Sequence, residues 1–454
     1  MSQTIKLKKG FDINLAGTAD KKIVEIEQPE TFALKPTDFV AITKPKVLVQ
    51  EGDNVKAGTP LLYDKEMEDV LYTAPVSGEV VEVKRGAKRK LLEIKILADK
   101  QIEFEQFQKY SASDLKSLSR EDATSQLKKS GVWPVIIQRP FGIVANPEEA
   151  PKSIFISGFD TNPNAADVGF ILEGQDQYFQ AGIDILRKLT EGQVHLNLDA
   201  KGEVPSVFSK VEGVEVNRFS GPHPAGNVGT QIHHIDPISK GEIVWTVSPF
   251  GVAQIGKLFL EGHHDSSRIV AVTGAEVKTP QYVKTYTGAC LDKLTAGNVK
   301  AEHVRFVSGN VLTGENVGKN GYLGYYHNQI SVIAEGDEEE FLGWIKPSAK
   351  KLSFHRAFGL LSFLSPKKEY VLDTNTHGEE RGFVVTGVFE EVMPMDILPT
   401  YLFKSIMAED FDDMEGLGIY EVIEEDVALC EFIDPSKQDL QQILREGLDL
   451  IRNS

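Results

Sequence analysis

The segment 220–237, SGPHPAGNVGTQIHHIDP, holds the side chains of this sequence that are best suited to ligand chemistry. Its histidines can hydrogen-bond a carbonyl or phenolic oxygen and exchange protons near neutral pH. Its prolines fix the path of the backbone, and its glycines let a ligand or another backbone approach closely. The candidate ligand-proximal residues are Gly221, Pro222, His223, Pro224, Gly226, Gly229, His233 and His234.

This segment follows a predicted strand of an α/β layer, so we predict a shaped loop at the carboxyl edge of the sheet, where such folds bind ligands. A rigid turn that packs one domain on another would need the same glycines and prolines, and this interpretation stays open. A metal site is disfavoured because neither an H-E-x-x-H pattern nor a Cys partner accompanies the histidines.

Nucleotide-binding signatures are incomplete. Gly251, Gly256 and Lys257 nearly match the spacing of a phosphate loop, but Leu258 stands where a Ser or Thr hydroxyl should hold Mg²⁺, and the segment has a helical pattern. No G-x-G-x-x-G occurs, so the pyrophosphate of a dinucleotide has no glycine cradle. Direct binding of NADH by this chain is therefore not expected.

Charge and cysteine content exclude further classes. The 454 residues include 49 Lys and Arg against 67 Asp and Glu, a net charge of −18 that repels phosphate backbones, so no nucleic-acid partner is expected. Cys290 and Cys430 are too few for a disulfide framework, a Cys-rich zinc site or an iron–sulfur cluster. Residues 1–20 lack the apolar region of a signal peptide, and no apolar run is long enough to span a bilayer.

The order of strand-like and helix-like runs around these residues predicts a multidomain α/β and α+β protein. Residues 44–97 alternate β-rich runs with glycine turns, which predicts a small sandwich similar to biotinyl/lipoyl carrier domains. Strands then alternate with helices, as in a Rossmann-like layer of parallel strands. We expect a biotinyl/lipoyl-like N-terminal domain over 1–105, a Rossmann-like α/β domain over 106–260, an SLBB-like β-grasp domain over 261–335 and a mostly helical C-terminal domain over 336–454.

A carrier domain holds its prosthetic group on a lysine at the tip of the hairpin before an A-P-x-x-G turn. That turn is 74–78 here, and counting back to the carrier position gives Met67, two residues away from Lys65. We therefore predict a carrier-like shape without a covalently bound group.

The C-terminal region combines apolar and acidic stretches. The segments 356–365 and 396–407 are more apolar than most monomer surfaces, and they form either core or a docking face for a membrane partner. The stretch 409–426 is acidic, but aligning its glycine with a calcium loop places Phe411 and Val422 where ligating carboxylates are required. A solvated acidic face is the better interpretation.

Several motifs in one order along nearly the whole chain resemble the NqrA family, which belongs to the sodium-translocating NADH:quinone oxidoreductases. The motifs are IKLKKGFDINLAG, TAPVSGEVVEVKRGAKR, FDTNPNAADVGFILEG, SGPHPAGNVGTQIHHIDP, IGKLFLEG with LTAGN after it, PMDILPTYLFKSIM and ALCEFIDPSK. A related subunit of Rnf complexes carries a glycine-rich flavin loop and ferredoxin-type Cys clusters. This sequence departs from that relative at both points, since only Cys430 remains near 428–437.

The resemblance implies a peripheral subunit on the cytoplasmic face of the inner membrane, in a complex that oxidises NADH, reduces quinone and exports Na⁺. It also implies that the other subunits carry FAD, FMN, riboflavin and iron or iron–sulfur centres, and that the large integral membrane subunit is the main partner. We expect this chain to help form or shape the quinone site, with no flavin or iron–sulfur centre of its own. A purely structural docking scaffold of the same complex is the alternative, and a free-standing flavin or nucleotide oxidoreductase is disfavoured by the missing glycine cradle.

Overall fold

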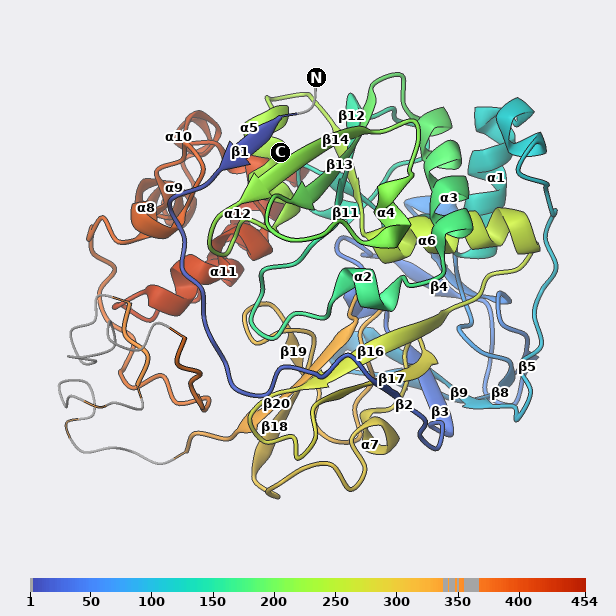
Figure 1. Ribbon diagram of the computed structural model, residues 1–454, viewed down its shortest axis with the longest axis horizontal. Helices are drawn as coiled ribbons and strands as arrows, with labels where there is room; N and C mark the ends of the chain where they lie inside the picture. The colour runs from blue at the N-terminus through green and yellow to red at the C-terminus, as the bar shows by residue number, and fades with distance from the viewer. Residues whose placement is uncertain (1–2, 338–341, 343–347, 349–350, 355–366) are drawn as a thin grey trace.

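The computed structural model describes residues 3–337, 342, 348, 351–354 and 367–454, and the predicted apolar stretch 356–365 lies outside these residues. Its parts surround a central α/β sheet: a sandwich and a second mixed sheet lie below it, and the C-terminal helices lie to one side (Figure 1). Among the described residues, no helix has both the length and the hydropathy that a membrane crossing needs.

The hairpin-rich run after residue 30 folds into two small antiparallel sheets, which confirms the predicted sandwich. One sheet is ordered β3 (Thr31–Leu34), β9 (Leu91–Ala98), β8 (Gly78–Arg85) and β5 (Asn54–Val55). The other is ordered β4 (Pro45–Val47), β6 (Pro60–Asp64) and β7 (Met67–Thr73). Alternating side chains of these strands are fully buried: Leu61, Val70, Val80, Ile94 and Ile96.

The α/β sheet has a parallel centre, as the alternation of strands and helices predicts. Its order is β1 (Thr4–Lys6), β14 (Glu215–Ser220), β13 (Gln193–Asp199), β12 (Ser153–Ser157), β15 (Val244–Val247), β10 (Ile136–Arg139) and β11 (Ile143–Val144). The first five strands pair in parallel, and β10 and β11 extend the sheet in antiparallel pairing. Short helices α2 (Val168–Ile171) and α4 (Ser206–Ser209) lie in its connections.

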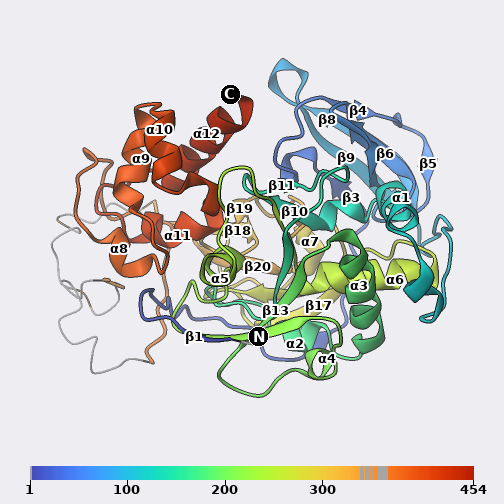
Figure 2. The same cartoon turned by 90° about the horizontal axis from the view of Figure 1, so that it is seen from above.

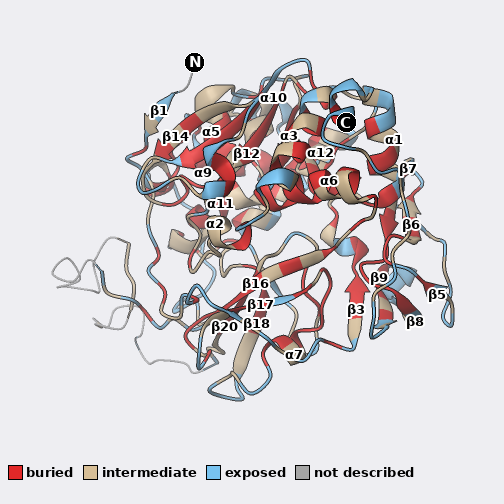
Figure 3. Ribbon diagram, turned by 45° about the vertical axis from the view of Figure 1, so that its right-hand side comes forward, coloured by how far each residue is buried: buried red, intermediate tan, exposed pale blue. Residues whose placement is uncertain are grey.

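Two long helices, α3 (Asp176–Leu189) and α6 (Pro249–Glu261), pack on each other against this sheet, near α1 (Arg120–Ser130) (Figure 3). They approach so closely that a Cβ on Gly256 would lie 1.8 Å from the Tyr178 carbonyl oxygen. A Cβ on Gly182 would similarly lie 2.0 Å from the carbonyl oxygen of Val252. The glycine that mimics a phosphate-loop position is therefore a helix-packing glycine inside a helix.

The N-terminal arm, residues 3–24, reaches beyond the sandwich. β1 adds to the edge of the α/β sheet beside β14, and β2 (Ile23–Val24) pairs in parallel with a strand of the third sheet, β17 (Gln281–Tyr286). The arm thus ties three parts of the fold together. The domain boundaries given above stay predictions.

The third sheet is mixed and is accompanied by one short helix among the described residues, as expected for a β-grasp unit. Its order is β19 (Glu315–Asn316), β18 (Val304–Ser308), β20 (Gln329–Ala334), β16 (Ser267–Thr273), β17 and β2. The hairpin of β16 and β17 is followed by α7 (Leu291–Leu294), and β20 returns parallel to β16.

The C-terminal region has the predicted helices from residue 389 onward, and they form a bundle beside the sheet (Figure 2), whereas residues 367–388 contain no helix. Its helices are α8 (Phe389–Val392), α9 (Pro399–Met407), α10 (Phe411–Gly416), α11 (Glu424–Ile433) and α12 (Leu440–Asn453). Ile13 and Leu15 of the N-terminal arm are buried in the same hydrophobic cluster as these helices.

The prediction of a loop over all of 220–237 is wrong in its second half, because α5 (Val228–Ile235) is a helix. Val228, Ile232 and Ile235 share one face of this helix and pack in a cluster with Phe155 and Val244 of the sheet. Burial of that apolar face explains why the segment is helical in spite of its glycines. Residues 221–227 form a loop before this helix, and residues 236–237 follow it.

Candidate functional site

The loop 221–227 begins where β14 ends, so it lies at the carboxyl edge of the parallel sheet as predicted. Its backbone passes close to two other segments. A Cβ on Gly226 would lie 2.7 Å from the Thr161 backbone nitrogen, and a Cβ on Gly10 would lie 2.2 Å from the His223 carbonyl oxygen. A Cβ on Gly221 would similarly lie 2.8 Å from the Cβ of Leu7 in the arm. The loop is therefore enclosed by the N-terminal arm and by the segment that follows β12.

His223 is almost fully buried at 1% exposure. Its backbone N–H donates to Asp12 Oδ1 at 2.8 Å, and its carbonyl accepts from Phe11 N–H at 2.8 Å. Its ring Nδ1 lies 3.1 Å from Thr161 Oγ1, and its Nε2 has no hydrogen-bond partner among the described residues. Burial lowers the pKa of His223 to about 4, so the ring is neutral at pH 7. This differs from the expectation of proton exchange near neutral pH.

The other two histidines of the segment lie on α5 and point to the C-terminal bundle. His233 Nδ1 lies 2.8 Å from Glu421 Oε2, and the Asp396 N–H donates to its Nε2 at 3.0 Å. Because Nε2 accepts, Nδ1 carries the ring proton and donates to the carboxylate. Burial and the neighbouring His233 lower the pKa of His234, whose buried Nε2 is unpaired within the described part of the chain. The structure thus places His233 and His234 in contact, with 5.2 Å between their ring centroids, and separates His223 from them.

Gly229 has a role that the sequence did not reveal. A Cβ at this position would lie 2.3 Å from Asp426 Oδ1 and 2.5 Å from Arg139 Nη1. Arg139 is 1% exposed, and its Nη1 lies 2.6 Å from Asp426 Oδ2 while its Nη2 lies 2.5 Å from Glu425 Oε1. A short distance along the chain, the Asn227 amide donates to the Glu425 carbonyl at 2.9 Å. The glycine-rich segment is therefore one of the contacts between the α/β sheet and the C-terminal helices.

The sequence alone did not indicate the ion pairs of Arg139 with Asp426 and Glu425. The ion pair joins positions 287 apart, and neither side has a local motif that indicates the other. The available signal is weak: Arg139 ends a strand that is otherwise almost wholly buried, and a buried arginine needs a carboxylate partner.

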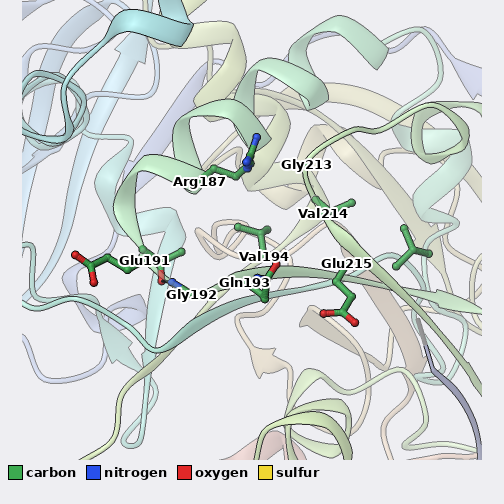
Figure 4. A pocket seen from close by; sticks show the side chains of 10 residues that line it. Arg187, Glu191, Gly192, Gln193, Val194, Gly213, Val214 and Glu215 are labelled. Atoms are coloured by element: carbon green, nitrogen blue, oxygen red, sulfur yellow. Dashed lines mark hydrogen bonds between the residues drawn. The ribbon is translucent and has the colours of Figure 1, made fainter. Parts of the chain in front are cut away.

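Two hollows of the structure are lined by residues outside the loop 221–227. One hollow of about 790 Å³ opens at the amino ends of β13 and β14, and its lining includes Arg187, Glu191 and Glu215 (Figure 4). This is the edge opposite to the one where α/β sheets bind ligands. A second hollow of about 660 Å³ lies between residues 238–240, the segment 396–398 before α9, and α10 with the residues that follow it up to Glu421.

The residues that cofactor motifs suggested have structural roles. Lys257 Nζ lies 2.5 Å from Asp265 Oδ2. Burial raises the pKa of the Cys290 thiol to about 11, and it raises that of Cys430 further. Lys65 is exposed in the two-residue turn between β6 and β7, while Met67 begins β7. No group of three or more His, Cys, Asp or Glu within the described ranges is placed to hold a metal ion.

Comparison with known proteins gives three matching family models. Residues 5–99 match the NqrA N-terminal barrel-sandwich hybrid domain, 118–264 match the NqrA second alpha/beta domain and 269–319 match the NQRA C-terminal domain. These matches follow the sandwich, the α/β sheet and the third sheet described above.

Curated relatives match over almost the whole chain. The chain is 41% identical to the A subunit of the Na(+)-translocating NADH-quinone reductase of Alcanivorax borkumensis, with 98% of this chain and 99% of the relative covered. The subunits of the same name from Pasteurella multocida and Rhodopirellula baltica are 41% and 39% identical, covering 98% of this chain and 99% and 97% of the relatives. Among solved structures, an NAD+-reducing [NiFe]-hydrogenase covers 78% of this chain and 67% of its own at 11% identity. Its TM-score of 0.37 is too low to indicate a shared overall fold.

High identity over nearly full length, together with three consecutive family models, leads to one conclusion: the chain belongs to the NqrA family of the Na(+)-translocating NADH-quinone reductases.

Proposed function

We propose that this chain is a peripheral component of a membrane complex that oxidises NADH, reduces quinone and exports Na⁺, and that it shapes the quinone site. It works on the cytoplasmic face of the inner membrane beside the large integral membrane subunit. It carries no flavin, iron–sulfur centre or other covalently bound group, and the redox cofactors belong to the other subunits. The names of its relatives support the reaction.

The observation that carries the quinone assignment is the Nε2 of His223, which has no hydrogen-bond partner within the described part of the chain, in the loop at the carboxyl edge of the sheet. A buried polar atom without a partner costs about 1–3 kcal/mol, a penalty that a ligand oxygen would remove. With a pKa of about 4, the neutral ring can donate one hydrogen bond to a quinone carbonyl but does not serve as a proton reservoir at pH 7. His223 and Gly226 therefore shape or contact the site, and protons for quinone reduction come from elsewhere.

The test is made in the assembled complex with His223→Ala and Gly226→Val. NADH oxidation with an artificial acceptor is measured beside quinone reduction, and His303→Ala serves as a control because its side chain is 69% exposed. Loss of one hydrogen bond predicts about tenfold slower quinone reduction, with the artificial-acceptor rate unchanged. Unchanged quinone reduction, or loss of both rates because the chain no longer assembles, would show that the loop is structural.

A second function, a docking scaffold that never contacts quinone, is favoured by a different observation. The outer surface of α9 and α10 exposes large apolar side chains beside many carboxylates. If this is the main role, substitutions on that surface reduce assembly of the complex, while those in the loop leave quinone reduction in the assembled complex unchanged.

A further inference from the structure

The outer surface of α9 and α10 is rich in exposed apolar side chains. Four large ones within fourteen positions are about two-fifths or more exposed: Leu398 at 50%, Tyr401 at 49%, Met407 at 56% and Phe411 at 39%. The opposite side of α9 is buried in the bundle through Leu402, Phe403 and Ile406. The exposed residues therefore leave a large part of their apolar surface uncovered by the bundle.

Carboxylates are frequent in the same segment as these apolar side chains. Between positions 396 and 421 the sequence has seven Asp and Glu and a single Lys. Those at Asp396, Glu409, Asp410, Asp412 and Asp413 are exposed. We call the exposed residues of 396–413 the acidic–apolar face.

A hollow continues this face. Its volume is about 660 Å³, and Ile397, Leu398 and Leu417 supply apolar lining beside the carboxylates of Asp412 and Glu415. One cation already uses this chemistry, because Lys240 Nζ lies 2.7 Å from Glu415 Oε1. The hollow thus offers both an apolar contact and acceptors for positive charge.

We propose that the acidic–apolar face binds a basic amphipathic segment of the membrane-embedded partner, one that lies next to a transmembrane helix on the cytoplasmic side. The inference rests on the proposed role as a peripheral component of a membrane complex. Apolar side chains of such a segment fill the hollow while its Lys and Arg residues meet the surrounding carboxylates. Cytoplasmic segments that flank membrane spans are enriched in Lys and Arg, so the charges are complementary. An anionic lipid surface would instead be repelled by this face.

Photo-cross-linking in the assembled complex identifies the occupant. Benzoylphenylalanine replaces Tyr401 in one variant and Leu48, a 47% exposed residue of the sandwich, in the control. We expect position 401 to cross-link to a Lys- and Arg-rich segment of an integral membrane subunit, and position 48 not to do so. Cross-links to residues 342–368 of the same chain, to a second copy or to lipid would overturn the proposal. An intact complex without cross-links at position 401 would also overturn it.

Charge reversal supplies a second measurement that does not depend on the cross-linker. Asp412→Lys combined with Asp413→Lys is compared with Glu203→Lys, an exposed carboxylate at the α/β domain. After a salt wash, we expect the amount of the double variant bound to the integral membrane subunits to be at least about fivefold lower, with the amount of the control unchanged. Equal retention of both overturns the charge argument. Because retention and cross-links are measured rather than quinone reduction, failure here leaves the test of His223 unaffected, and the reverse also holds.

Discussion

Arg139 and Asp426 form an ion pair in which the arginine is 1% exposed and the carboxylate is fully buried, with 2.6 Å between Nη1 and Oδ2. The pair joins the end of β10 to the first turn of α11, and Gly229 of α5 lies directly against both partners. A buried ion pair contributes little net stability, but loss of one partner leaves an uncompensated charge. The position of the C-terminal helices therefore depends on a glycine in the middle of the chain.

Gly229→Ala tests this dependence. The added methyl group would push Asp426 or Arg139 out of the pair, so we expect the free energy of unfolding to fall by about 3 kcal/mol. Urea denaturation measures it. Gly416→Ala is the matched control, because no atom lies within 4 Å of its added Cβ. Equal stability of the two variants would mean that the pair does not hold the helices in place.

Burial of His223 predicts a pH dependence of stability. Its pKa falls from 6.5 to about 4 on folding, so the unfolded state binds more protons and stability decreases as the pH falls from 6.5 towards 4. Between pH 7 and pH 5 this one residue accounts for a loss of about 2 kcal/mol. The free energy of unfolding of His223→Gln should decrease less between pH 7 and pH 5. Denaturation curves at the two pH values measure this difference. Parallel losses in the variant and the original chain would show that the ring is accessible to protons in the folded state.

Gly256 is predicted to be a packing residue and not part of a nucleotide loop. Gly256→Ala would place a methyl group against the Tyr178 carbonyl, so we expect a loss of about 3 kcal/mol in stability, whereas Gly382→Ala, with open space around it, should be neutral. Calorimetry of the original chain with ATP and Mg²⁺ should give no heat of specific binding. Binding that is abolished by Lys257→Met would contradict the helix-packing interpretation.

These residues show how far the sequence alone could lead. Local patterns predicted a layer in which strands alternate with helices, and β12 and α3 are two elements of that layer. Burial on one face imposes a period that is visible in a single segment. The helix α5 was missed because its apolar positions are few and glycine and proline dominate the segment around it. Its partners in the sheet are distant in sequence, so no local pattern indicated which face of the helix is buried.

The candidate site shows the same limit. The sequence located the loop at the carboxyl edge of the sheet, because a strand before a Gly- and Pro-rich segment is a local feature. It could not reveal that His223 is enclosed by Asp12 and Thr161, since burial is set by segments 211 and 62 positions away. The pKa of the ring follows from that enclosure and not from its neighbours in the chain.

The carrier-like sandwich leads to a prediction about covalent modification. Lys65 occupies the tip of the β6–β7 hairpin, yet the position that carrier domains modify corresponds to Met67. Intact mass spectrometry of the chain purified from the assembled complex should therefore give the mass of the bare polypeptide, near 50.2 kDa. A lipoyl, biotinyl or flavin adduct on Lys65 would contradict this.

Photolabelling of the assembled complex with a reactive quinone tests most directly whether this chain shapes the quinone site. We expect adducts on this chain in or beside the loop 221–227, including the adjoining segments around Asp12 and Thr161, and we expect excess unlabelled quinone to suppress them. His303, exposed on the third sheet's side of the chain, should stay unlabelled. Labelling confined to other subunits, with this chain free of adducts, would show that this chain does not shape the quinone site and would favour the docking scaffold.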